Sequence, residues 1–217
     1  MADTTKRIII IGAGGHGQVV ADILWQMHAA GLPVRPTGFL DENSALHGQV
    51  FLDLPVLGRL ADLPAVPHEA VVVAVGDNQV RQRLFLALAG QGEQFQTACH
   101  PRATIARDVA IGAGSMVCAA VVINTGSRIG RNVILNTGCT IDHHNQIGDH
   151  AHIAPGAHLG GEVTVAEMVL VGIGATVLPR RHIAPLSVVG GGAVVTRDVS
   201  AGSTVVGVPA HSLEKRP

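Results

Sequence analysis

The stretch from Ile129 to Ile147, IGRNVILNTGCTIDHHNQI, decides the fold of the second half of the chain. Every sixth residue in it is Ile or Leu, and this spacing of Ile, Leu or Val continues without a gap from Ile105 to Val195. A period of six fits neither an α-helix nor a plain β-strand. It is typical of a parallel β-helix whose coil has three short flat sides and three corners.

Residues eighteen positions apart are then expected to stack, so Ile123, Ile141 and Leu159 fall on one inward ladder. β-Branched aliphatic side chains suit such stacked sheets. Four positions after each inward aliphatic the residue is nearly always small or apolar, and Asn145 and Arg181 are the departures. A glycine often follows the inward aliphatic directly, and we expect it to let the corner turn tightly. These glycines are Gly112, Gly130, Gly148, Gly160, Gly172 and Gly190.

The composition of the 217 residues excludes several classes of protein. The net charge is -1 and only 2% of residues are aromatic, so no basic surface with interleaved aromatics is available for nucleic acid. No apolar stretch approaches the ~18 residues of a membrane span, and no secretory signal precedes the first strand. The three cysteines form no paired framework and are interpreted as small buried hydrophobes in a cytoplasmic protein.

The first hundred residues predict alternating strands and helices. Ile8–Ile11, Val34–Leu40 and Val71–Val75 are predicted strands. A helix that ends before Gly31 is expected to bury one face, and a second one, capped near Asp77 or Asn78, ends at Gly90. The buried face of the first helix is predicted to hold Val19, Val20, Ile23, Leu24 and Met27. We therefore predict an α/β Rossmann-like domain at residues 1–100, followed by an all-β parallel β-helix at residues 101–217.

A glycine-rich turn, Gly12-Ala13-Gly14-Gly15-His16-Gly17, joins the first strand to the first helix. Such a turn directs backbone N–H groups and a helix N-terminus at an anion, usually a phosphate. Asp41 follows about twenty residues later at the end of the second strand. A turn without ligand, a dinucleotide site and a nucleotide-sugar site all remain open. The last is favoured, because nothing after residue 100 is typical of a hydride-transfer domain.

A cluster of histidines lies in the β-helix, and three interpretations compete for it. The histidines are surface side chains without a role, ligands of a zinc ion, or a catalytic base, since an imidazole can accept a proton near neutral pH. The cluster consists of His143, His144, His150, His152 and His158.

The segment from Ile134 to Gly148, with Thr140-Ile141-Asp142-His143-His144 at its centre, resembles the catalytic coil of bacterial nucleotide-sugar acetyltransferases of the hexapeptide-repeat family. That group includes UDP-4-amino-sugar and perosamine N-acetyltransferases and sialic acid O-acetyltransferase relatives. Further matching motifs run along the whole chain: the glycine-rich turn, Phe39-Leu40-Asp41-Glu42, Ala74-Val75-Gly76-Asp77-Asn78 with Arg81, Gly172-Ile173-Gly174-Ala175, Gly190-Gly191-Gly192-Ala193 and Val206-Gly207-Val208-Pro209-Ala210.

The resemblance implies a left-handed β-helix and a role for individual residues. His143 would be the catalytic base, with His144 beside it at a position where the family commonly has Glu or Asp. His152, Ile173 and Gly191 would contact acetyl-CoA. The nucleotide sugar would be held by Gly14, Gly15, His16, Asp41, Glu42 and Gly76.

The resemblance also implies the reaction, which is acetyl transfer from acetyl-CoA to the amino group of a nucleotide-linked amino sugar, for bacterial surface glycan synthesis. A homotrimer with acetyl-CoA between subunits is expected, with no resident metal and no nucleic-acid or membrane partner. The alternatives are O-acetylation of a sugar hydroxyl by the same residues, a non-catalytic nucleotide-sugar-binding protein, and a zinc-dependent hydratase.

Overall fold

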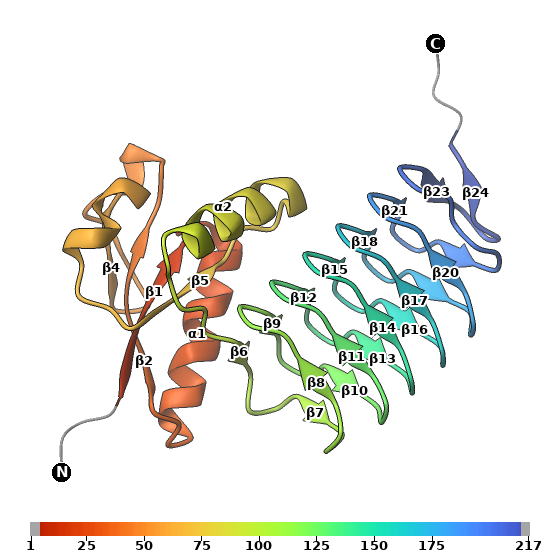
Figure 1. Cartoon of the computed structure of the whole chain (residues 1–217), viewed down its shortest axis with the longest axis horizontal. Coiled ribbons are helices and arrows are strands. Elements are labelled where there is room, and N and C mark those ends of the chain that lie inside the picture. Colours follow the sequence, from red (N-terminus) through yellow and green to blue (C-terminus); the bar gives the residue numbers. More distant parts are fainter. Residues whose placement is uncertain (1–4, 214–217) are drawn as a thin grey trace. The chain divides into compact units, whose positions relative to one another are not determined.

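The computed structural model describes residues 5–213 (Figure 1). The chain divides into two compact units, Met1–Pro101 and Arg102–Pro217. Among the described residues, neither helix combines the length and the apolar character that crossing a membrane requires.

The first unit is built on a five-stranded sheet in the order β3-β4-β2-β1-β5. The strands β1, β2, β4 and β5 pair in parallel, and only β3 runs antiparallel to its neighbour β4. The unit also contains the short strand β6 (Ala98–Cys99). The strand bounds are β1 (Lys6–Ile11), β2 (Val34–Leu40), β3 (Val50–Phe51), β4 (Leu54–Gly58) and β5 (Ala70–Val73).

Two α-helices, α1 (Gly15–Ala29) and α2 (Asn78–Gly90), follow β1 and β5 directly. The α/β prediction is therefore confirmed, with α2 capped by the Asp77 carboxylate, which accepts from the Val80 N–H at 2.8 Å. Two details of the prediction were wrong. Val19 lies on the solvent side of α1 with 42% of its surface exposed, and β5 ends at Val73 rather than at residue 75.

The sequence did not indicate the segment between β2 and β5. It holds two 3₁₀ helices, η1 (Ser44–Leu46) and η2 (Leu60–Ala65), and the strands β3 and β4. β3 has two residues and β4 contains Pro55 and ends on Gly58, so neither presents a clear alternation. Leu63 of η2 nevertheless joins the unit's core, with Ile9, Ile11, Leu40, Val71, Val73, Phe85 and Leu88.

The second unit is a left-handed parallel β-helix, as predicted (Figure 1). Three sheets of short strands, all of two residues except β23, form its sides. One contains β7 (Thr104–Ile105), β10 (Val122–Ile123), β13 (Thr140–Ile141), β16 (His158–Leu159), β19 (Thr176–Val177) and β22 (Val194–Val195). The next contains β8 (Ala110–Ile111), β11 (Arg128–Ile129), β14 (Gln146–Ile147), β17 (Thr164–Val165) and β20 (His182–Ile183). The third contains β9 (Met116–Val117), β12 (Ile134–Leu135), β15 (His152–Ile153), β18 (Leu170–Val171), β21 (Val188–Val189) and β23 (Thr204–Val206), with β24 (His211–Ser212) antiparallel to β23.

The inward ladders have the predicted register of eighteen residues. Ile123 pairs with Ile141, and Ile141 pairs with Leu159, all three of them buried. The third residue of successive corners adopts a positive φ, at Gly126, Asn132, Gly138 and His144 among others. Non-glycine residues at this position carry some backbone strain, and Asn tolerates it best.

The glycines that directly follow the inward aliphatic residues were predicted to let the corner turn tightly. The structure gives a different reason for glycine at these positions. They do not adopt a positive φ. Instead, a side chain on Gly112 would lie 2.5 Å from the backbone of Gly130, and one on Gly172 would lie 2.7 Å from the Gly191 nitrogen. These positions are glycine because the next coil approaches the backbone too closely for a Cβ atom.

Candidate functional site

The glycine-rich turn between β1 and α1 has two kinds of glycine. A Cβ on Gly17 would collide with the Gly12 carbonyl oxygen, and Gly12 has a φ of +105°, so these two glycines are needed to build the turn. A Cβ on Gly14 or Gly15 would meet no atom within 4 Å. The first turn of α1 therefore presents an open, unobstructed backbone, which suits a phosphate at a helix N-terminus.

Asp41 organises this turn. Its Oδ2 accepts a hydrogen bond from the Ala13 N–H at 2.7 Å, and its Oδ1 accepts one from the Asn43 N–H at 2.8 Å. The Gly12 N–H donates to the Leu40 carbonyl at 2.8 Å. The end of β2 thus fixes the backbone of the turn that follows β1.

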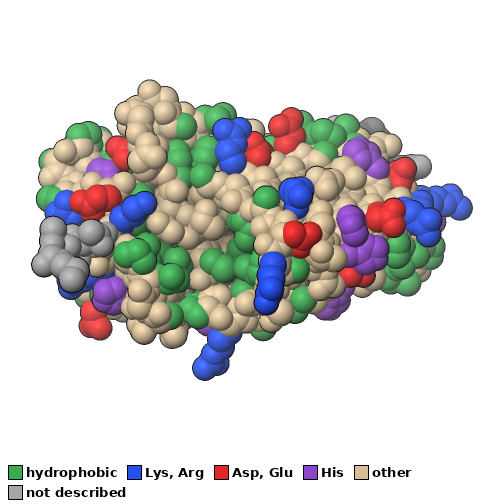
Figure 2. Space-filling model, turned by 60° about the horizontal axis from the view of Figure 1, so that its bottom comes forward, with side chains coloured by type: hydrophobic (Ala, Val, Ile, Leu, Met, Phe, Trp, Pro, Cys, Tyr) green, Lys and Arg blue, Asp and Glu red, His purple; other side chains and the backbone are tan. Residues whose placement is uncertain are grey.

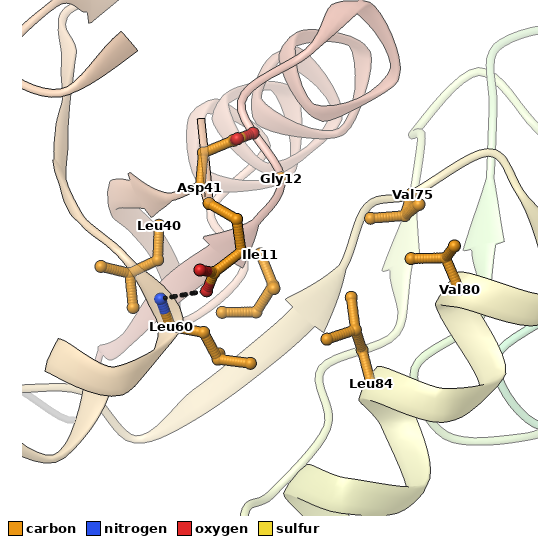
Figure 3. Close-up of a pocket in the computed structure, with 9 residues that line it drawn as sticks. Ile11, Gly12, Leu40, Asp41, Leu60, Val75, Val80 and Leu84 are labelled. Atoms are coloured by element: carbon orange, nitrogen blue, oxygen red, sulfur yellow. Dashed lines mark hydrogen bonds between the residues drawn. The ribbon is translucent and has the colours of Figure 1, made fainter. Parts of the chain in front are cut away.

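A cavity of about 160 Å³ opens beside the turn, at the carboxyl ends of the strands (Figure 3). Its wall is mainly aliphatic, with the carboxylates of Asp41 and Glu42 at one side; Glu42 Oε1 accepts from the Leu60 N–H at 3.0 Å. Such a chamber suits a flat, weakly polar ring with a few polar edges. It is lined by Ile11, Gly12, Leu40, Asp41, Glu42, Leu60, Val75, Val80 and Leu84.

His16 lies in the first turn of α1 and Arg81 in the first turn of α2. The Nε2 atom of His16 is buried and has no hydrogen-bond partner, and burial, with the charge of Arg81 as a second cause, lowers the pKa of His16 to about 4. Arg81 is fully buried and donates to the carbonyls of Val75 and Gly76 at 3.1 and 3.2 Å. Burial lowers its pKa to about 10, so Arg81 stays cationic and His16 neutral at pH 7.

The other sequence-predicted residue of this unit, Gly76, lies in the exposed loop after β5, and a Cβ there would meet no atom within 4 Å. It stands beside Val75, which lines the cavity. The loop around Gly76, the cavity and the glycine-rich turn therefore lie at one end of the same sheet.

In the β-helix, His143 and His144 form a pair at one corner. Both side chains are exposed, and their Nδ1 atoms lie 3.1 Å apart. A methyl group on Gly161, one coil further on, would lie 2.5 Å from His143 Nε2, and one on Gly126, one coil earlier, would lie 2.5 Å from His144 Cδ2. Each ring thus lies against a glycine of a neighbouring coil. Figure 2 shows histidine side chains gathered beside charged ones on the β-helix part of the molecule.

Asp142 supports this corner through the Asn124 side chain and the His143 backbone. Its Oδ1 accepts from Asn124 Nδ2 at 2.9 Å and from the His143 backbone N–H at 2.8 Å. The hydrogen bond from Asn124 and then that from His143 hold the pKa of Asp142 below its ordinary value. The imidazole of His143 therefore has His144, and not a carboxylate, as its partner.

The residues predicted to contact acetyl-CoA lie elsewhere on the β-helix. Ile173 is 67% exposed at another corner, and a Cβ on Gly191 would lie 3.3 Å from the Ile173 carbonyl oxygen. His152 lies on the side that leads into this corner, with its Nε2 3.2 Å from Asn136 Nδ2. The His143 corner and the Ile173 corner are different edges of the same prism. Within the described residues, no group of three or more His, Cys, Asp or Glu is arranged to hold a metal ion.

Comparison with known proteins identifies the family. The family description "PglD N-terminal domain" matches residues 7–88. The chain is 34% identical to the GDP-perosamine N-acetyltransferase of Escherichia coli O157:H7 over 151 residues, which cover 67% of this chain and 68% of the relative. The chain belongs to the nucleotide-sugar N-acetyltransferase family. The resemblance inferred from the sequence motifs is thereby confirmed.

Other members of this family agree. The UDP-N-acetylbacillosamine N-acetyltransferase of Bacillus subtilis is 34% identical over 116 residues, 52% of each chain. PerB from Caulobacter crescentus, solved with CoA and GDP-perosamine, superposes with a TM-score of 0.86 at 35% identity over 95% of this chain and 96% of that one. The acetyltransferase domain of PglB from Neisseria gonorrhoeae superposes with a TM-score of 0.87 at 32% identity over 96% of this chain and 100% of that one.

Three further residues contact the His143 corner or its neighbours and were not predicted to have a function: Gly161, Ser127 and Asn145. The stacking of residues eighteen apart was a usable signal for Gly161, since this spacing sets it directly beside His143. Asn145 was conspicuous as a polar residue at an inward position, but its hydrogen bonds could not be read from spacing.

Proposed function

We propose that this chain transfers the acetyl group of acetyl-CoA to the amino group of a nucleotide-linked amino sugar. The observation that carries the proposal is the His143 corner. It combines an exposed imidazole, a hydrogen-bond partner at Nδ1 and an Nε2 atom that makes no hydrogen bond to the described residues, in a member of the nucleotide-sugar N-acetyltransferase family. These are the properties that a general base needs.

In the proposed reaction the sugar ammonium first loses one proton to solvent. The amine nitrogen then attacks the thioester carbonyl carbon, and His143 Nε2 takes a second proton from that nitrogen. When the C–S bond breaks, the same proton passes to the CoA sulfur, so that amide and free thiol are the products. No covalent acyl-enzyme is needed, and burial raises the pKa of Cys118 to about 11 and of Cys139 to about 12, which makes them poor nucleophiles.

The nucleotide sugar is proposed to bind to the first unit, at residues 1–100. The open backbone at Gly14 and Gly15 suits the phosphates, and the cavity beside Asp41 and Glu42 suits the base. His16 and Gly76 would complete this site, and the neutral state of His16 lets its Nε2 either donate or accept a hydrogen bond.

Acetyl-CoA is proposed to bind to the β-helix, residues 101–217, through His152, Ile173 and Gly191. Support for a homotrimer comes from the separation of the His143 and Ile173 corners, because one prism cannot bring two of its own edges to one thioester. A complete site would take His143 from one subunit and the Ile173 corner from another. We also propose a cytoplasmic location, supported by the free state of Cys99, Cys118 and Cys139.

The test is acetyl-CoA consumption by the purified protein with a panel of GDP-, UDP- and dTDP-linked amino sugars, with the matching hydroxy sugars as controls. We expect turnover with an amino sugar and none with its hydroxy counterpart. His143→Ala should lower kcat by about 10²- to 10⁴-fold, as removal of a general base does. Retention of more than half of the activity by folded H143A would rule out His143 as the base.

A further inference from the structure

Several corners of the β-helix are closed by their own backbone. The Cys139 N–H donates to the Asn136 carbonyl at 3.1 Å, and the Ala157 N–H donates to the Ala154 carbonyl at 3.2 Å. The same bond from the fourth corner residue to the first recurs on other coils, as from Ala175 to Gly172. A corner of this kind therefore takes its shape without help from side chains.

The corner that carries His143 is closed differently. The Asn145 N–H donates to Ser127 Oγ at 3.1 Å, on the preceding coil. The Asp142 carbonyl, which would accept this backbone bond, accepts instead from Ser127 Oγ at 2.9 Å and from Asn145 Nδ2 at 2.6 Å. Two buried side chains thus replace the backbone bond at this corner.

Asn145 closes the next corner as well. Its Oδ1 accepts from the Val163 N–H at 3.1 Å, and its Nδ2 also donates to the Gly160 carbonyl at 3.0 Å. The side chain is completely buried, so every one of these hydrogen bonds is shielded from water. One amide group therefore ties two consecutive corners to each other.

These two corners are the ones between which the His143 ring lies. The imidazole belongs to the first corner and packs against Gly161 of the second corner. The space between the ring and Gly161 is too small for a Cβ atom. The Glu162 N–H donates to the His143 carbonyl at 2.9 Å, which adds a second link between the two corners. The position of Nε2 consequently depends on how far apart and in what register the corners are held.

We infer that Asn145 is a positioning residue for the acetyl transfer: its buried amide holds the His143 and Gly161 corners in the register that sets His143 Nε2 for proton transfer. The inference rests on the proposed function of His143. Asn145 does not contact substrate, and it acts through the imidazole. An error of about 1 Å in such a group can cost about 10²-fold in rate.

The chain offers a matched control for the effect that loss of a corner-closing side chain has on the fold alone. Ser115 closes another corner in the same way, with its Oγ donating to the Gly130 carbonyl at 2.8 Å and accepting from the Val133 N–H at 3.0 Å. It is buried like Asn145, but the corner that it closes carries no candidate catalytic group. Loss of Ser115 should therefore weaken the fold without moving His143.

The experiment compares kcat, both KM values and the melting temperature of Asn145→Ala and Ser115→Ala in the full-length protein. We expect both variants to melt at lower temperature. N145A should lose about 10- to 100-fold in kcat with both KM values within about twofold of wild type, whereas S115A should keep its kcat. Equal kcat values for the two folded variants, or parallel losses in kcat and both KM values for N145A, overturn the inference.

If N145A does not fold, Asn145→Ser replaces it, since a serine hydroxyl closes a single corner at Ser115 and cannot reach both corners here. The same kcat loss is expected, and a wild-type kcat overturns the inference. Gly161→Ala is an independent variant, because Gly161 has no positive φ and the three atoms nearest to its methyl group would all belong to the His143 ring. It should melt normally and lose kcat; a normal kcat overturns the inference too.

The His143→Ala variant separates this inference from the proposed function. If H143A keeps its activity, the proposed base is wrong and the positioning argument fails with it. If H143A is inactive while N145A and G161A keep wild-type kcat, the base is correct and only the inference about Asn145 fails.

Discussion

The Nδ1 atoms of His143 and His144 face each other at 3.1 Å. A hydrogen bond requires one donor and one acceptor, so two neutral imidazoles can form it only if one ring carries its proton on Nδ1 and the other on Nε2. A base that works through Nε2 must carry its proton on Nδ1. His143 is then the donor and His144 the acceptor in this pair.

This relationship predicts that position 144 needs a hydrogen-bond acceptor and not a histidine as such. We expect His144→Asn to keep kcat within a few-fold of wild type, because its Oδ1 can accept from His143 Nδ1–H. His144→Leu should lose about 10- to 100-fold, because the tautomer and orientation of His143 are no longer fixed. Steady-state kinetics on both variants gives the comparison.

The backbone conformation at position 144 should tolerate both replacement residues, so it should not affect the comparison of H144N with H144L. His144 has a φ of +58°, and the equivalent corner position is occupied elsewhere by Asn132 with +54° and by Leu186 with +61°. Both replacement residues are therefore tolerated by corners of this chain. If H144N and H144L had the same kcat, the contact between the two rings would have no part in catalysis.

The two kinds of glycine in the turn after β1 predict opposite effects of substitution. Gly15→Val should raise the KM for the nucleotide sugar by at least about tenfold and leave the melting temperature and CoA binding unchanged, because its side chain projects into open space where the phosphates are proposed to bind. Gly17→Ala should instead lower the melting temperature, because its Cβ would collide with the Gly12 carbonyl. Calorimetry with each ligand separates the two. Equal loss of both ligands by G15V would contradict the assigned site.

The homotrimer is predicted from the separation of the His143 and Ile173 corners. Light scattering should give a mass near three times 22.4 kDa. Mixing inactive His143→Ala subunits with subunits that carry Ile173→Glu should restore part of the activity, because some interfaces then combine two intact corners. A monomer with full activity at nanomolar concentration would exclude the shared site.

The hexad period made the β-helix predictable to the residue. A strict repeat fixes which side chain faces inward and which residues stack, so the ladder of Ile123, Ile141 and Leu159 follows from counting alone. The same counting gives the corner position of His143. It does not give the strands β3 and β4, which are too short and too rich in turn residues to form a pattern.

The hydrogen bonds of individual side chains could not be predicted from the sequence. Asp41 was interpreted as a residue that holds the nucleotide sugar, and both its oxygens accept bonds from the protein's own backbone. Asn145 was noticed only as an exception to an apolar pattern. In both cases the partners of the side chain are backbone atoms at 2.6–3.1 Å, and backbone atoms are the same for every sequence. The three-dimensional fold decides which of these backbone atoms a side chain meets.

His16 predicts a specific dependence of stability on pH. Its pKa of about 4 in the folded protein lies below the ordinary value of 6.5, because burial and then the charge of Arg81 disfavour the imidazolium. Between these two values the unfolded chain binds a proton that the folded chain does not, so the free energy of unfolding falls as the pH is lowered from 6.5 towards 4. The difference corresponds to at most about 3 kcal/mol. We therefore expect His16→Gln to lose less stability than wild type between pH 7.5 and pH 4.5, measured by urea unfolding at both pH values. Equal losses for the two proteins would mean that His16 can take up a proton in the folded state.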